Sequence, residues 1–570
     1  MSQIKFLILF PFLFVFVGCG RVRDVRNQLT YDDLIDGFQI RNPVKERALT
    51  IPENAFPPQH VFEGELELLG EDDNGQIKGI RGAEIIPSNL PEFHFQFVQQ
   101  DGYLIPLKRG LITTADENWN FFLEPGRVWY EVTDGDYSRA SFPFALSWKG
   151  SNGIHNGTMT FLFNDDDISK VWYQVTQETT IGVSADLWGF LDAEYHPGKV
   201  AGAEEIKNNF LQELSDRFPS KPIEALETDY PGIDISAFGS DVSPDAMTWY
   251  GFVIDGVNYV GGCQTRYGTY PYCEYMRAPS HSTAKSAFVS VALMRLAQKF
   301  DPRVGESLIL DYVPEAKGSI GDWSSVTFDH ALDMATGNFR SSTRMVDEEQ
   351  WDTDPFWVEL DYEPLIEAAF NWPHSALPGT TWVYRTSDTF ILTRALQNYL
   401  EFQQVDQADI YDFVVQEVYQ PLRMGPGVFT TLRTRDDNWQ GQPYGGYGLW
   451  WIPDDLAKLS RFLNVDHGQI DGVQILDPDM LDDALQRDPT DRGVVRDGEG
   501  RYNNAFWADQ YTSERDEACK FWVVNMYGYS GIVVTLMPNG TTYYYASDNQ
   551  EFFSYAAIQE SDKLLSMCGD

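Results

Sequence analysis

The chain has 570 residues, which is too long for one ordinary domain and predicts two or three. Its 43% hydrophobic and 14% aromatic residues are ample for packed cores, which excludes a wholly disordered chain. The 85 acidic and 42 basic residues give a formal net charge of -43, and the sequence contains no basic stripe. A phosphate backbone would be repelled, so nucleic acid is excluded as a partner and a solvated acidic surface is expected.

A short apolar run opens the chain. Lysine 5 precedes the run from Phe6 to Val17, which is too short to cross a bilayer as a helix. The run ends in Phe16-Val17-Gly18-Cys19, which resembles the lipobox of bacterial lipoproteins. The resemblance implies a signal peptide over residues 1–18 and lipidation of Cys19. Because glycine rather than aspartate follows, it also implies an outer-membrane anchor facing the periplasm. An ordinary secretory signal is the alternative.

Residues 19–58 are polar and predict a tether. Residues 59–200 show the residue pattern of short β-strands. Apolar and polar residues alternate over 62–68 and again over 172–176, and turn clusters such as Ser151-Asn152-Gly153 separate the runs. Short strands without a long helical period predict a β-sandwich-like or jelly-roll domain. Its many aromatic residues are expected in the core, with a ligand groove as in carbohydrate-binding modules as the alternative. The trio Asp165–Asp167 lacks the spacing of a calcium loop and predicts a solvated turn.

Residues 201–229 predict a helical connector. Apolar residues recur at helical spacing from Ala203 to Phe218, and Pro219 follows directly. From residue 230 to residue 570, short strands alternate with long helical patterns, which predicts an α+β domain.

Four cysteines remain after Cys19. They are Cys263, Cys273, Cys519 and Cys568. An even number in an exported chain predicts disulfides, and of the three possible pairings the sequence-local one joins Cys263 to Cys273 and Cys519 to Cys568. No C-x-x-C pair or histidine cluster accompanies them, so no metal site is expected.

The segment most informative about chemistry is the S-x-x-K pattern of Ser282 and Lys285. An almost wholly apolar run of helical length, Ser286 to Leu296, follows it, and such a helix belongs in a domain interior. Ser282 is then expected at the N-terminal end of this helix, where unpaired N–H groups favour negative charge. Lys285 lies one turn later and can reach the serine hydroxyl. Burial lowers the pKa of a lysine, so Lys285 is predicted to be the base that activates Ser282, with His281 pointing away.

The order of the motifs around Ser282 resembles serine β-lactamases, penicillin-binding proteins and related esterases. A β-hairpin over Met247–Val260 precedes the S-x-x-K helix, as in that family. Four further segments follow in the family's order: Val326–Gly337 (the "T-x-G" turn), Pro378–Ser387 (the tyrosine motif), Gln420–Met424 ("P-L-G-M") and Gly446–Ala457. The resemblance implies an antiparallel sheet flanked by helices and an acyl-enzyme reaction that needs no cofactor and no metal.

The same resemblance assigns roles to individual residues. Tyr384 matches the tyrosine that exchanges a proton with the nucleophile and the lysine, which implies a general acid–base role. The third motif, K-T-G or H-x-G in relatives, is matched by Tyr529-Ser530-Gly531. The strand that follows implies an oxyanion hole made by the N–H groups of Ser282 and Ile532.

Two departures from the family pattern bear on the substrate. Arg385 and Thr386 replace a serine and an asparagine of the tyrosine motif, and Tyr529 replaces a lysine or histidine that receives substrate carboxylates. Tyrosine offers only a neutral hydrogen bond, and Arg385 is the alternative source of positive charge. We therefore expect an exported serine hydrolase that cleaves a small-molecule or cell-wall-related ester or amide and meets the membrane only through its lipid anchor. A β-lactamase or D,D-carboxypeptidase is the first alternative, and an inactive cell-envelope binding protein is the second.

Overall fold

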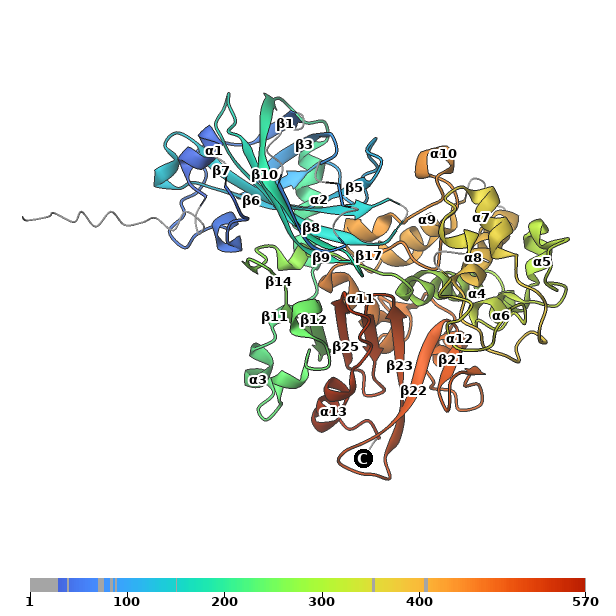
Figure 1. Ribbon diagram of the computed structural model, residues 1–570. Helices are drawn as coiled ribbons and strands as arrows, with labels where there is room; N and C mark the ends of the chain where they lie inside the picture. Colours follow the sequence, from blue (N-terminus) through green and yellow to red (C-terminus); the bar gives the residue numbers. More distant parts are fainter. Residues whose placement is uncertain are drawn as a thin grey trace, which may run out of the picture.

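The computed structural model describes residues 29–37, 40–69, 76–82, 86–87, 90–149, 151–350, 354–403 and 408–568. The predicted signal peptide and Cys19 lie outside these residues. Within them, no helix combines the length and the apolar character that crossing a bilayer requires. Two large sheets organise the chain, an N-terminal one coloured blue to green and a C-terminal one coloured mainly orange to red in Figure 1.

The N-terminal strands form one antiparallel sheet that closes on itself. The order is β1-β3-β4-β6-β7-β8-β9-β10, and β10 pairs again with β1. The two-sheet sandwich predicted from the strand pattern is therefore replaced by a closed sheet, because β10 is long enough to pair with β9 and then with β1. The strands are β1 (Glu63–Leu69), β2 (Gln76–Arg81), β3 (Phe93–Gln100), β4 (Tyr103–Pro106), β5 (Trp119–Leu123), β6 (Gly126–Trp129), β7 (Ser138–Trp148), β8 (Ile154–Phe163), β9 (Val171–Thr179) and β10 (Ser184–Pro197). Strand β2 pairs with β10 and β5 pairs with β7.

Aromatic side chains fill the interior of this barrel. Phe62 packs against Phe161 with ring centroids 5.8 Å apart, and Phe97 packs against Phe142 at 5.1 Å. All four are buried, so these rings serve as core rather than as a ligand groove. The predicted turn at Asp165–Asp167 is confirmed as an exposed loop.

The described part of residues 29–58 is packed against the barrel and is not a tether. Helix α1 (Tyr31–Asp36) and a 3-10 turn (η2, Glu46–Leu49) contribute Leu34 and Leu49, which are fully buried with Trp172 and Trp188. The prediction was wrong here because apolar residues scattered among polar ones carry no local period, and only the barrel's outer face shows that they are buried.

The connector belongs partly to each sheet. Helix α2 (Ala203–Asp216) lies on the barrel, where the ring of Phe210 packs 5.0 Å from that of Tyr103. Strand β11 (Ser220–Pro222) already runs parallel to β13 in the C-terminal sheet. The second region therefore begins near residue 219, inside the predicted connector.

The C-terminal region is a sheet that is antiparallel except for β11, with helices on both faces, which confirms the α+β fold class. In the described chain its order is β11-β13-β12-β25-β24-β23-β22-β21-β20. The strands are β12 (Met247–Ile254), β13 (Val257–Gly262), β20 (Val494–Val495), β21 (Arg501–Asn503), β22 (Phe506–Thr512), β23 (Lys520–Gly528), β24 (Ile532–Leu536) and β25 (Thr542–Ser547). The predicted hairpin is formed by β12 and β13, and its Asp255-Gly256 turn has positive φ at both residues, as a tight hairpin turn needs.

Two groups of helices cover the sheet. Helices α3 (Ala225–Asp229) and α13 (Tyr555–Leu564) pack on one face. On the other face, α11 (Pro453–Asn464) packs against β12, β24 and β25, and it shares one core with α4 (Val291–Lys299), α5 (Ile309–Tyr312), α6 (Phe328–Leu332), α7 (Tyr362–Ala369), α8 (Thr386–Phe402), α9 (Ile410–Val414) and α12 (Pro478–Ala484). Helix α10 (Asp436–Trp439) buries none of its residues. Short ladders lie outside the sheet: β14 (Gln264–Thr265) with β15 (Gly268–Thr269), β16 (Ala278–Pro279) with β17 (Trp450–Trp451), and β18 (Gln469–Ile470) with β19 (Val473–Gln474).

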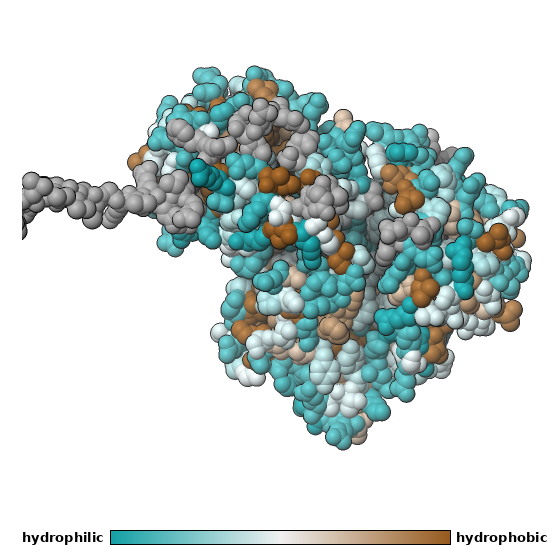
Figure 2. Space-filling view, in the orientation of Figure 1, coloured by the Kyte–Doolittle hydropathy of each residue, from teal (hydrophilic) through white to brown (hydrophobic). Residues whose placement is uncertain are grey.

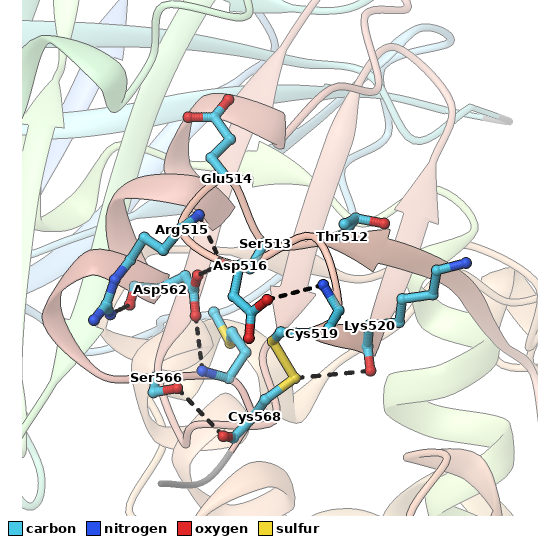
Figure 3. The surroundings of a disulfide bond; sticks show 12 residues. Thr512, Ser513, Glu514, Arg515, Asp516, Cys519, Lys520, Asp562, Ser566 and Cys568 are labelled. Atoms are coloured by element: carbon cyan, nitrogen blue, oxygen red, sulfur yellow. Dashed lines mark hydrogen bonds between the residues drawn. A yellow bond between two sulfur atoms is a disulfide. The ribbon is translucent and has the colours of Figure 1, made fainter.

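Both predicted disulfides form in the sequence-local pairing. Cys263 is bonded to Cys273, and Cys519 is bonded to Cys568. The second bond ties the loop between β22 and β23 to the segment after α13 (Figure 3). Near it, Asp562 of α13 accepts hydrogen bonds from the Ser513 hydroxyl and from the N–H of Met567. Disulfides persist in oxidising compartments, so the two bonds fit an exported protein.

The barrel and the C-terminal region share buried polar contacts. The guanidinium of Arg277 pairs with the carboxylate of Glu124, which also pairs with Arg109. The amide of Asn156 accepts from the N–H of Arg277 and donates to its C=O, and the Tyr270 hydroxyl donates to the C=O of Gly157 at 2.7 Å. The segment that leads from β13 to Ser282 therefore rests on the barrel. The coloured part of the face shown in Figure 2 is mostly hydrophilic, with apolar residues scattered over it.

Candidate active site

Ser282 lies in the turn that opens the buried helix, as its sequence position predicts. Residues 283–299 are helical, and the first part is a π-helical stretch (η8, Lys285–Ser290) that continues into α4. Such π-helical turns often occur at functional sites. Lys285 Nζ lies 2.8 Å from Ser282 Oγ. The helix therefore presents a hydroxyl and an amine to each other across one turn.

Lys285 is buried, and the groups in hydrogen-bond contact with its amine are neutral. Its Nζ also contacts Thr386 Oγ1 at 2.8 Å and the C=O of Gly446 at 3.3 Å. In the described chain no carboxylate lies within ion-pair distance of it. Burial lowers the pKa of Lys285 to about 8, although the charge of Glu348 opposes this shift. About a tenth of the amine is then uncharged at pH 7, and this neutral form is the one that a general base requires.

Glu348 is a member of this cluster that sequence reasoning missed. Its carboxylate accepts from Thr386 twice, from the N–H at 2.8 Å and from Oγ1 at 2.6 Å. Burial raises the pKa of Glu348, and the nearby Lys285 partly offsets the rise. Glu348 comes from the long loop between α6 and α7, which has no pattern that distinguishes one acidic residue from another. Only its burial beside the lysine marks it as part of the site.

Tyr384 completes the group around the serine. Its hydroxyl hydrogen-bonds to the Ser282 side chain, and Lys285 Nζ lies 4.8 Å from the centre of its ring. Burial, and then the charge of Glu348, raises the pKa of Tyr384, so the phenol keeps its proton at neutral pH. Trp507 and Tyr502 pack against the ring and hold it in place, with centroids 5.3 Å and 6.3 Å away.

The third motif lies at the β23–β24 hairpin. Tyr529, Ser530 and Gly531 form its turn, and Ser530 and Gly531 have φ of 73° and 101°. At Gly528 the hairpin packs against the turn that contains Ser282, which we call the nucleophile turn. An added Cβ at Gly528 would fall 2.4 Å from the C=O of Ser280. Only glycine fits there.

Ile532 is the first residue of β24 and lies opposite Gly528 of β23 on one side and Ala546 of β25 on the other. An N–H in a strand paired on both sides is directed at a neighbouring strand. The strand register therefore does not support Ile532 as an oxyanion donor. Tyr529, which follows Gly528 directly, is the first residue beyond this pairing and lies beside the nucleophile turn.

His281, immediately before the nucleophile, is half-buried and has φ of 42°. This left-handed conformation is uncommon for a residue with a side chain and costs on the order of 1–3 kcal/mol. Its Nε2 contacts Ser530 Oγ at 3.2 Å, so the imidazole faces the hairpin and not the serine. Burial, and then the charge of Lys285, lowers the pKa of His281 to about 3, so the ring is neutral.

Arg385 does not face the serine with a free charge. Its Nη2 contacts both carboxylate oxygens of Asp388 at 2.6 Å and Thr336 Oγ1 at 2.9 Å. The guanidinium lies 4.8 Å from the Trp372 ring and is buried. Its neighbour Thr386 is the residue that reaches Lys285, so the two substituted positions of the tyrosine motif have different surroundings.

One cluster in the described chain has the composition of a metal site, and it lies on the barrel. Glu67 of β1 and Glu194 and His196 of β10 bring their ligand atoms within 4.8 Å of one another. His196 Nε2 is 3.1 Å from Glu67 and all three side chains are solvent-accessible. These residues contribute nothing to the group around Ser282.

No family model and no curated protein matches the chain. Several solved structures are similar to it. A class C β-lactamase has 13% identical residues over 65% of this chain and 99% of its own, with a TM-score of 0.40. A D-stereospecific amidohydrolase from a Streptomyces species has 13% identity over 58% and 96%, with a TM-score of 0.39. A penicillin-binding protein homologue from Caulobacter crescentus has 16% identity over 56% and 92%, with a TM-score of 0.37. A shared fold does not define a shared reaction, so the chemistry rests on the residues of the site.

Proposed function

We propose that the protein is a serine hydrolase that cleaves an ester or amide through an acyl-enzyme on Ser282. The observation that carries this proposal is the contact between the Ser282 hydroxyl and a buried lysine whose pKa is lowered to about 8. A lysine buried without a carboxylate partner is costly, and such groups cluster at functional sites.

The reaction follows from the positions of the three side chains. Neutral Lys285 takes the proton of Ser282 while Oγ attacks the substrate carbonyl carbon, and the carbonyl electrons move onto oxygen. The N–H of Ser282 and an N–H of the β23–β24 hairpin, for which Tyr529 is the best-placed residue, stabilise the oxyanion. The carbonyl re-forms as the leaving group departs with a proton from Lys285 or from the Tyr384 hydroxyl. Water, deprotonated by the same groups, then releases the acid and restores Ser282.

The surroundings favour uncharged substrates. The charge of Arg385 is neutralised by Asp388, and Tyr529 offers a hydroxyl where relatives carry a cation. Glu348 lies beside Lys285. Burial, together with the negative charge of Glu349, raises the pKa of the Tyr529 hydroxyl. Among the described residues, neither Arg385 nor Tyr529 offers a substrate carboxylate the free cation that relatives carry at the third motif, so neutral esters and amides fit better than β-lactams.

A fluorophosphonate probe tests the nucleophile. We expect stoichiometric labelling of the wild-type protein and none of Ser282→Ala. Ser290→Ala is the matched control, because Ser290 is buried in the same helix and its hydroxyl finds no partner among the described residues. Labelling that survives Ser282→Ala would contradict the assignment. Hydrolysis of p-nitrophenyl acetate compared with nitrocefin separates an esterase from a β-lactamase, and faster nitrocefin turnover would overturn the substrate class.

The same proposal places the mature protein outside the cytosol, anchored by a lipid on Cys19. The two disulfides support export. Metabolic labelling with palmitate is expected to mark the wild-type protein in the membrane fraction, and Cys19→Ser is expected to lose the label. Equal labelling of both forms, or none of the wild type, would contradict the anchor.

A further inference from the structure

The N-terminal barrel reaches the nucleophile turn through one side chain. Asn152 lies in the connection between β7 and β8, at the end of the barrel that meets the C-terminal region, and is only 2% exposed. Its Oδ1 accepts from the N–H of His281 at 2.7 Å, from the N–H of Gly448 at 3.1 Å and from Ser280 Oγ at 3.1 Å. Its Nδ2 donates to the C=O of Leu449 at 2.9 Å. Backbone partners of fixed polarity thus define the orientation of this amide.

These contacts join two segments that each supply a group at the reacting serine. The first, Ser280-His281, precedes Ser282 directly. The second follows Gly446, whose C=O contacts Lys285 Nζ. The two segments are already linked by the β16–β17 ladder and by the bond from the Ser280 N–H to the C=O of Leu449 at 2.8 Å. Asn152 extends this link by one residue, to His281.

His281 is the residue that most needs such support. Its left-handed backbone is unfavourable and persists only where the surroundings define it. Its side chain contacts Ser530 in the C-terminal sheet, and its N–H donates to Asn152 of the barrel, so each of the two large sheets supplies one of these bonds. A relaxed His281 would turn the Ser282 hydroxyl away from Lys285.

We propose that Asn152 is a positioning residue for Ser282, so that the barrel is a built-in part of the active site and not an independent binding module. The inference rests on the proposed function of Ser282 and deepens it. Asn152 touches neither the reacting atoms nor Lys285, and it acts through the backbone of His281 and Gly448. Misplacement of a nucleophile by about 1 Å can lower a rate by about 100-fold.

The test measures the acylation rate of the full-length protein in single-turnover experiments with p-nitrophenyl acetate, at a pH well above 8 so that Lys285 is neutral in every variant. Asn152→Ala is expected to slow acylation by about 100-fold with a much smaller change in KM. Asn152→Asp retains an oxygen acceptor for the two N–H groups but turns its second oxygen toward the C=O of Leu449, so it is expected to recover part of the rate lost in Asn152→Ala. Asn156→Ala is the matched control, because Asn156 is equally buried and bonds to the backbone of Arg277, which lies five positions before Ser282, whereas His281, the partner of Asn152, is adjacent to Ser282.

Two results would overturn the proposal: a folded Asn152→Ala protein that acylates at the wild-type rate, or an Asn156→Ala protein that is slowed as much as Asn152→Ala. A wild-type protein that is never acylated would instead refute the function of Ser282. In that case the crystal structure of Asn152→Ala still decides the positioning role. We expect His281 to leave the left-handed region and Ser282 Oγ to move away from Lys285 Nζ, and an unchanged turn would contradict this.

Discussion

Arg139 of the barrel and Lys285 beside Ser282 are buried cations with different partners. In the barrel, Arg139 is bound by Asp134 through two hydrogen bonds, and both side chains are buried. At Ser282, the buried Lys285 contacts two hydroxyls and a carbonyl, and none of the described carboxylates touches it. A paired charge keeps its proton and holds structure, whereas a buried lysine without a partner is free to exchange its proton. The comparison locates the chemistry in the C-terminal region and leaves the barrel with a supporting role.

The largest expected effect comes from removing the unpaired charge. Lys285→Ala should lower the acylation rate by about 10³-fold, since general base catalysis contributes about 10²- to 10⁴-fold. Lys299→Ala, at the exposed end of the same helix, is the control and should leave the rate unchanged. Fluorophosphonate labelling kinetics measure both. If Lys285→Ala labels as fast as the wild type, buried unpaired charge does not mark the site.

The paired charge of the barrel should show the opposite behaviour. Arg139→Ala leaves Asp134 buried and unpaired, which should cost about 3–5 kcal/mol of the free energy of unfolding. Urea denaturation measures the loss, and Arg81→Ala, which breaks a half-exposed pair with Asp548, should cost about 0–1 kcal/mol. At a temperature where Arg139→Ala remains folded, its acylation rate should equal that of the wild type. A large rate loss there would erase the distinction between the two regions.

Tyr384→Phe separates the phenol from its ring. The substitution keeps the packing against Trp507 and removes only the hydroxyl that hydrogen-bonds to Ser282, so kcat should fall by about 10²-fold with little loss of stability. Tyr502→Phe is the control, because the neighbouring Tyr502 hydroxyl is buried and has no hydrogen-bond partner in the described chain. Equal rates for the two variants would remove Tyr384 from the proton transfer.

The smallest expected effect is a change in the pH profile. Since only neutral Lys285 accepts a proton, kcat/KM should rise with pH through the lysine pKa of about 8. The negative charge of Glu348 stabilises the protonated lysine and opposes the lowering of its pKa. Glu348→Gln should therefore move the rise to lower pH, while Glu349→Gln, exposed and one residue further on, should leave the midpoint in place. A shift to higher pH would contradict the coupling between Glu348 and Lys285.

Sequence reasoning was most successful where the deciding distances are short along the chain. The Ser282–Lys285 spacing on a helix, the Asp255-Gly256 turn and the Cys263–Cys273 bond all depend on residues no more than ten positions apart, and the structure contains each of them. The Cys519–Cys568 bond, across 49 positions, also formed as the sequence-local pairing predicts. Sequence reasoning was less successful for the third motif. The residue pattern did not show that Tyr529-Ser530-Gly531 is a turn or that Ile532 is paired with a strand on both sides.

By itself, the sequence determined the α+β character of the C-terminal region and the serine and lysine on one buried helix, because helical and strand periods are local properties of the chain. Only the tertiary structure decided that β10 closes the barrel on β1, that Glu348 lies beside Thr386, and that Asn152 supports a turn 129 positions away. Such contacts depend on which surfaces meet after the chain has folded. Burial, pairing and pKa are set by those neighbours, so they cannot be read from any short segment.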